Sequence, residues 1–72
     1  MKIEVDKYGE VWVMTNRGEI YVQRENNDWI QQASDAKDVG VGSDGSVWYL
    51  TAYGEPAEIP RLNETIYMTN AE

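Results

Sequence analysis

The stretch DGSVWYLTAYGE, Asp44 to Glu55, has a close counterpart earlier in the chain, YGEVWVMTNRGE, Tyr8 to Glu19. The two superpose with an offset of 36 residues, which is also the spacing between Trp12 and Trp48. When residues 3–19 are laid on residues 39–55, seven of seventeen positions are identical. Unrelated sequences would share roughly one, and a fixed period of about 20 to 50 residues is typical of repeat proteins.

This period divides the chain into two halves of one domain, residues 1–36 and residues 37–72. Each half alternates short β-branched or aromatic runs with turns rich in Gly, Asn and Asp, a pattern that predicts antiparallel strands. In the first half we expect strands at Lys2 to Asp6, Val11 to Thr15, Glu19 to Arg24 and Trp29 to Ser34. In the second half we expect them at Asp38 to Val41, Ser46 to Thr51 and Thr65 to Thr69.

Between the last two of these strands lies the segment GEPAEIPRL, which contains Pro56 and Pro60. Proline cannot donate to a strand ladder, so this third strand should lie at an edge, be distorted or be replaced by a loop.

Strands covered on both sides are predicted at Val11 to Met14 and at Val47 to Leu50, because both alternating faces of each run are apolar. A propeller blade is covered in this way by its neighbours, so an all-β fold of two four-stranded blades is expected. Propellers need about four to eight blades, so ring closure requires a cyclic homo-oligomer. The alternative is a monomeric β-sandwich with an accidental repeat. The expected core between blades consists of Trp12, Trp48, Val11, Val47, Met14 and Leu50.

Composition excludes several classes of function. The 72 residues include no Cys and no His, so disulfides, the usual zinc sites and Ser-His-Asp or thiol catalysis are ruled out. The net charge of −7 disfavours direct binding to nucleic acid or to anionic membranes. Asp44 is expected to turn a hairpin rather than to bind calcium, because the ligand spacing of a calcium loop is missing. We therefore expect no enzyme activity, no metal and no cofactor.

The chain resembles the tectonin repeats of the tachylectin-related β-propellers. The motif Asp-Gly-x-Val-Trp is carried by Asp44, Gly45, Val47 and Trp48. The first repeat supplies Gly9, Val11, Trp12, Gly18, Ile20, Tyr21, Trp29 and Ile30. Tyr8 replaces the turn Asp, and EPAEIP replaces the Gly-x-Ile-Tyr segment of the second repeat. The resemblance implies binding of carbohydrate or protein rather than catalysis, and its usual six blades imply a trimer of two-blade chains.

Ligand-binding residues are expected where the turns between second and third strands share a face with the loop joining the repeats. These residues are Asn16, Arg17, Ser34, Asp35 and Tyr53; the alternative is that they form ordinary solvated turns. We also expect Trp29 to be buried.

Two functions remain open from the sequence. The first is a lectin-like module for a carbohydrate or surface ligand. The second is a small acidic inhibitor or adaptor, of a kind that a phage or virus encodes, which docks on a basic protein through Glu55, Glu58 and Glu64. The acidic surface has the alternative role of keeping the protein soluble. The charged start MKIEVDKYGE argues against a signal peptide, so we expect a cytoplasmic protein or part of a viral or cell-surface particle.

Overall fold

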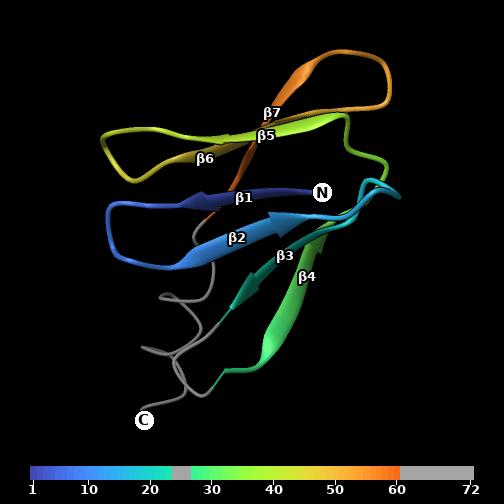
Figure 1. The fold of residues 1–72 in the computed structure, drawn as a ribbon. Helices are drawn as coiled ribbons and strands as arrows, with labels where there is room; N and C mark the ends of the chain where they lie inside the picture. Colours follow the sequence, from blue (N-terminus) through green and yellow to red (C-terminus); the bar gives the residue numbers. More distant parts are fainter. Residues whose placement is uncertain (24–26, 61–72) are drawn as a thin grey trace, which may run out of the picture.

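The computed structural model describes residues 1–23 and 27–60, and this part of the chain forms two antiparallel sheets (Figure 1). The first sheet has the order β1-β2-β3-β4 and the second has the order β5-β6-β7. The strands are β1 (Lys2–Val5), β2 (Val11–Met14), β3 (Ile20–Gln23), β4 (Trp29–Ala33), β5 (Asp38–Val41), β6 (Val47–Leu50) and β7 (Pro56–Ile59). Within each sheet consecutive strands pair, so each sheet is a simple meander, as expected for a blade.

The predicted strands in the described residues are confirmed within one or two positions at each end. The Pro-containing segment forms β7, which begins at Pro56 and stands last in the described order of its sheet, while Pro60 lies beyond the strand. A proline at the first position of a strand leaves the following ladder bonds intact. The strand predicted at Thr65 to Thr69 lies outside the described residues.

Four hairpin turns in the described residues share one geometry. In each, the first residue's N–H donates to the carbonyl four residues on, and the fourth residue is a Gly whose N–H donates back to the first residue's carbonyl. The turns begin at Asp6, Thr15, Gly42 and Thr51. In three of them the first side chain also accepts bonds from two backbone N–H groups. Gly42 has no side chain, and Asp44 substitutes by accepting from the Ser46 N–H and hydroxyl. The predicted hairpin role of Asp44 is confirmed.

The hydrophobic core lies between the two sheets. Residues paired across a ladder share a face, so the register puts Trp12, Ile20 and Val22 on one face of the first sheet. The same rule puts Val39, Val47 and Ile59 on one face of the second sheet. All six side chains are buried in one cluster. We call this contact the internal junction.

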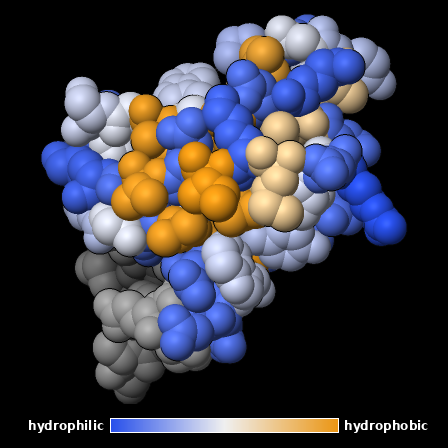
Figure 2. All heavy atoms as spheres, in the orientation of Figure 1, coloured by the Kyte–Doolittle hydropathy of each residue, from blue (hydrophilic) through white to orange (hydrophobic). Residues whose placement is uncertain are grey.

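The other face of each sheet is exposed. On the outer face of the first sheet, Ile3 and Val5 retain 62% and 56% of their accessible surface. On the outer face of the second sheet, Trp48 and Leu50 retain 45% and 38%. Figure 2 shows part of this exposed apolar surface as an orange patch over β1 and β2.

The predicted interblade residues divide into two groups. Trp12 and Val47 are buried at the internal junction, and the half-buried Met14 packs against it. Val11 is half-buried on the outer face of the first sheet. Trp48 and Leu50 are not core within one chain, because no second layer of the described residues covers their face. Trp29, also expected to be buried, is exposed for the same reason.

Candidate functional site

The predicted ligand residues lie in connections at one end of the two sheets. Figure 1 shows the β2–β3 turn, the β6–β7 turn and the β4–β5 connection opposite the β1–β2 and β5–β6 turns. Arg17 and Tyr53 occupy repeat-equivalent positions in their turns, 36 residues apart. Both are exposed, and Tyr53 retains 90% of its accessible surface. An aromatic ring so exposed on a turn is available to a partner.

The connection between the sheets packs directly on the β2–β3 turn. The Ala36 N–H donates to the Gly18 carbonyl at 2.9 Å, and a Cβ at Gly18 would stand 2.7 Å from the Ala36 carbonyl oxygen. This close approach brings Ser34 and Asp35 next to the turn that carries Asn16 and Arg17. Four of the five predicted residues therefore lie in two connections whose backbones touch at Gly18 and Ala36, while Tyr53 stands on a separate turn.

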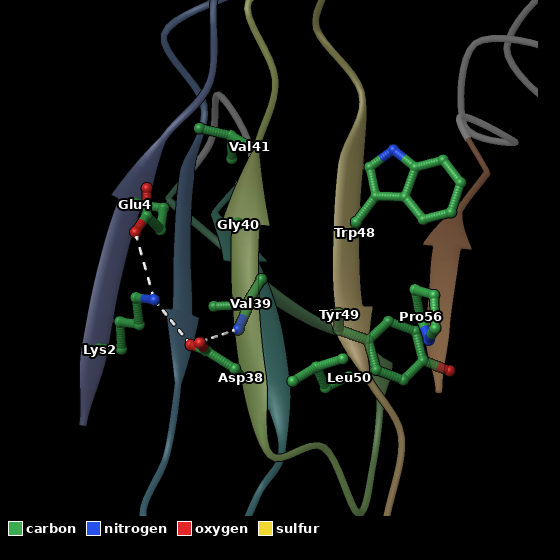
Figure 3. A pocket seen from close by; sticks show the side chains of 10 residues that line it. All are labelled: Lys2, Glu4, Asp38, Val39, Gly40, Val41, Trp48, Tyr49, Leu50 and Pro56. Atoms are coloured by element: carbon green, nitrogen blue, oxygen red, sulfur yellow. Dashed lines mark hydrogen bonds and ion pairs between the residues drawn. The ribbon is translucent and has the colours of Figure 1, made fainter. Parts of the chain in front are cut away.

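A groove of about 420 Å³ lies over the outer face of the second sheet (Figure 3). Its lining includes the indole of Trp48, the side chain of Leu50 and the bare backbone at Gly40. Lys2 and Glu4 of β1 line it beside β5. Sequence patterns did not predict this groove, because it joins β1 to a strand 36 residues further on.

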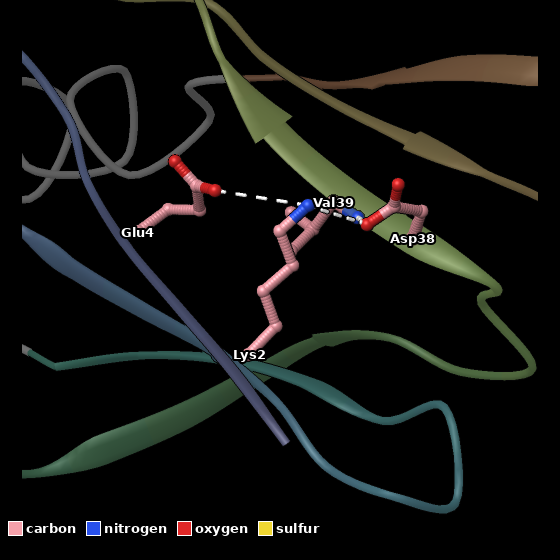
Figure 4. Close-up of polar contacts among 4 residues, drawn as sticks. All are labelled: Lys2, Glu4, Asp38 and Val39. Carbon is pink, nitrogen blue, oxygen red and sulfur yellow. Dashed lines mark hydrogen bonds and ion pairs between the residues drawn. The ribbon is translucent and has the colours of Figure 1, made fainter.

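The charged side of the groove is an ion-pair cluster, drawn in Figure 4. Lys2 Nζ lies 2.6 Å from Asp38 Oδ1 and 3.7 Å from Glu4 Oε2. The same Asp38 oxygen accepts a bond from the Val39 N–H at 2.8 Å. The hydrogen bond to Asp38 raises the pKa of Lys2 although desolvation opposes it, and the bond from Lys2 lowers the pKa of Asp38. Both groups are solvent-exposed, so the pair orients β1 against β5 more than it stabilises the fold.

The groove offers an indole face and side chains of both charge signs. Within residues 1–23 and 27–60, no three carboxylates come close enough together to hold a metal ion. The same part of the chain contains no helix long and apolar enough to cross a membrane.

Asp6 is a structural residue that sequence reasoning missed. It is 5% exposed, and it accepts three bonds of 2.9 Å, from the Tyr8 N–H, the Glu10 N–H and the Trp12 indole N–H. Burial favours the neutral acid, but these donors outweigh it and lower the pKa of Asp6. The signal that could have found it is the shared turn pattern, Asp-x-x-Gly at residues 6–9 and Thr-x-x-Gly at residues 15–18 and 51–54.

The residues of the acidic alternative lie partly in the described region. Glu55 is exposed directly before β7, and Glu58 is exposed within β7 on the outer face of the second sheet. Glu64 lies outside the described residues.

Comparisons with protein-family models, with curated proteins and with solved structures found no match to this chain. The tectonin resemblance therefore rests on the motif residues alone.

Proposed function

We propose that this chain is a non-catalytic, lectin-like binding module, built as two blades of a β-propeller that several copies complete. The supporting observation is that two repeat-related sheets pack face to face, with the β2–β3 turn of the first and the equivalent β6–β7 turn of the second at the same end. In the propeller these turns form one rim of the ring, with Arg17 and Tyr53 at equivalent places on successive blades.

The proposed ligand is a carbohydrate, in keeping with the resemblance to tectonin repeats. Sugars are bound through apolar stacking on an aromatic ring together with hydrogen bonds from polar side chains. Tyr53 supplies the ring at the β6–β7 turn, whereas Asn16, Arg17, Ser34 and Asp35 supply amide, guanidinium, hydroxyl and carboxylate groups at the β2–β3 turn and the β4–β5 connection. A six-bladed ring made from three chains would present three copies of the Tyr53 ring and three copies of the set of polar side chains.

A glycan array tests this function. The wild-type chain should bind a defined group of glycans, and Tyr53→Ala should lose them with an unchanged far-UV circular dichroism spectrum, because the Tyr53 side chain is almost fully exposed. The matched control is Tyr53→Phe, which keeps the aromatic ring at the same exposed position and should keep glycan binding. An array with no wild-type signal would remove the carbohydrate ligand from the proposal.

A second candidate is favoured by the exposed carboxylates of β7. Glu55 directly before β7 and Glu58 within it are exposed carboxylates of a chain whose net charge is −7, which suits a basic protein surface. Binding to immobilised basic proteins should weaken steeply as salt rises, and the double variant Glu55→Lys, Glu58→Lys should lose it. Binding that is independent of salt would contradict this second function.

A further inference from the structure

The internal junction shows how two sheets of this repeat pack on each other, and the two outer faces offer the surfaces for a second contact of the same kind. At this junction the inner face of the first sheet, with Trp12 at its centre, packs on the inner face of the second sheet, which carries Val39 and Val47. The repeat equivalent of Trp12, 36 positions further on, is Trp48, which lies on the outer face of the second sheet. The repeat equivalent of Val39, 36 positions earlier, is Ile3, which lies on the outer face of the first sheet.

The two outer faces are therefore the repeat equivalents of the two inner faces that meet at the internal junction, but within one chain nothing described packs on them. Trp12 is 4% exposed whereas its equivalent Trp48 is 45% exposed. Val39 is 2% exposed whereas its equivalent Ile3 is 62% exposed. Apolar side chains recur at two further positions, since Leu50 corresponds to Met14 and Val11 corresponds to Val47. Glu58 stands at the position equivalent to the buried Val22, so the outer face of the second sheet carries a carboxylate there. Large apolar side chains that are exposed side by side on one face are typical of an interaction site.

Charge is complementary across this second contact as well. At the internal junction, Lys2 reaches its own repeat equivalent, Asp38, at 2.6 Å. If the next copy stacks in the same way, the equivalent neighbours are Asp38 of one copy and Lys2 of the next. Each Asp38 would then lie between two Lys2 side chains, so every adjacent pair along the stack has opposite charge.

Turn packing follows the same rule. At the internal junction the Tyr8 ring packs so closely on the β5–β6 turn that a Cβ at Gly45 would stand 2.6 Å from it. Gly9 is the repeat equivalent of Gly45, and nothing in the described residues lies within 4 Å of a Cβ built there. The space over Gly9 is where the β5–β6 turn of a preceding copy would fit, with the smaller Asp44 in the place of Tyr8.

We infer that the outer face of the second sheet docks on the outer face of the first sheet of a second copy, repeating the internal junction. The contact is head to tail, so Trp48 of one copy covers Ile3 and Val11 of the next. This inference rests on the proposed propeller and specifies its interface. The groove over Trp48 is then part of a subunit contact, and the ligand site lies at the turns.

Two complementary variants test the contact by mass. Trp48→Asp spoils the outer face of the second sheet, and Ile3→Asp spoils that of the first. Each full-length variant alone should run as a monomer of 8.2 kDa in native mass spectrometry and light scattering. Mixed at equal amounts, they should form a dimer through the one intact contact and nothing larger. The wild type should show a closed ring, about 25 kDa for the three chains of a six-bladed propeller.

A second variant guards against misfolding. Leu50 retains 38% of its accessible surface on the outer face of the second sheet, and its repeat equivalent Met14 packs against the core of the internal junction. Leu50→Asp should therefore fold as a single chain yet prevent docking, and it should also pair with Ile3→Asp. Tyr53→Ala, which lies on neither outer face, should keep the wild-type mass.

The outcomes separate this inference from the proposed function. A wild-type monomer, face variants that keep the wild-type mass, or a mixture that stays monomeric while the wild type assembles would each overturn the head-to-tail contact. A ring that binds no glycan would leave the contact intact and remove only the carbohydrate ligand.

Discussion

The buried contact between Asp6 and Trp12 makes a quantitative prediction about folding. In Asp6→Asn, the amide oxygen can take the place of Oδ1 and keep the bonds from the Tyr8 and Glu10 N–H groups, each 2.9 Å long. The amide nitrogen then replaces Oδ2 and stands 2.9 Å from the Trp12 indole nitrogen. Two donors face each other, and the indole N–H loses its carboxylate acceptor in a site that is nearly closed to solvent.

The magnitude follows from that geometry. A hydrogen bond to a charged group contributes about 1.5–3 kcal/mol, and a buried donor left without an acceptor costs about 1–3 kcal/mol. These two terms overlap, so we expect Asp6→Asn to lower the free energy of unfolding by about 2–4 kcal/mol. The whole free energy of unfolding of a domain of this size is only about 4–11 kcal/mol. The variant should therefore be close to unfolding at body temperature.

Urea denaturation followed by circular dichroism measures the loss, with Trp12→Phe as the partner in a double-mutant cycle. Phe keeps an aromatic ring but has no N–H, so Trp12→Phe should cost clearly less when Asp6→Asn is already present than in the wild type. The matched control is Asp44→Asn, because that exposed turn residue uses a single oxygen that Asn retains. A change below about 0.5 kcal/mol in Asp6→Asn, or additive effects in the cycle, would refute the assigned role.

Three further outcomes are expected from the packing of turns, carboxylates and sheets. Gly45→Ala should destabilise the chain by about 1–3 kcal/mol more than Gly9→Ala, because both sites have positive φ but only Gly45 faces the Tyr8 ring; equal losses in urea titrations of monomeric Ile3→Asp backgrounds would contradict this. The pKa of Asp6 is lowered from 3.8 in the folded state, so its stabilisation is complete above pH 3.8 and disappears as the pH falls through the lower folded value; the urea midpoint of the wild type should therefore approach that of Asp6→Asn in acid. Exchange of the charges in Lys2→Asp, Asp38→Lys should keep the ring, whereas Lys2→Asp alone should weaken it, as native mass spectrometry can show.

Strands and turns could be predicted because their signals are local. Each of the four described hairpin turns carries a Gly at its fourth position and is flanked by short β-branched or aromatic runs, so a window of about ten residues holds the information. For the Pro-containing segment the sequence left three structures open: an edge strand, a distorted strand or a loop. Pro56 is acceptable only at the start of a strand or in an edge strand, and whether a strand lies at an edge depends on neighbours that are distant in the sequence.

Burial could not be predicted in the same way. Trp12 and Trp48 have nearly the same local sequence, yet their exposed fractions are 4% and 45%. The difference arises because a two-sheet chain has one internal junction and two outer faces, so equivalent residues receive a partner in one repeat and none in the other. The groove and the Lys2–Asp38 pair have the same origin, since both join residues one full repeat apart.

A ring and a fibre differ in what becomes of the two outer faces. A chain of stacked sheets always leaves two unlike outer faces, so adding a copy in the head-to-tail manner moves the exposed faces without removing them. Only closure covers both, and it requires that the rotation from sheet to sheet add up to a full turn over a whole number of chains. If it does, the wild type should show one discrete mass that stays constant when the protein is concentrated. If the rotation fails to close, the same Trp48 and Ile3 surfaces should produce filaments whose length grows with concentration, and Ile3→Asp added in small amounts should shorten them by blocking one end. Light scattering over a dilution series decides between the two, and only the discrete mass is compatible with the proposed propeller.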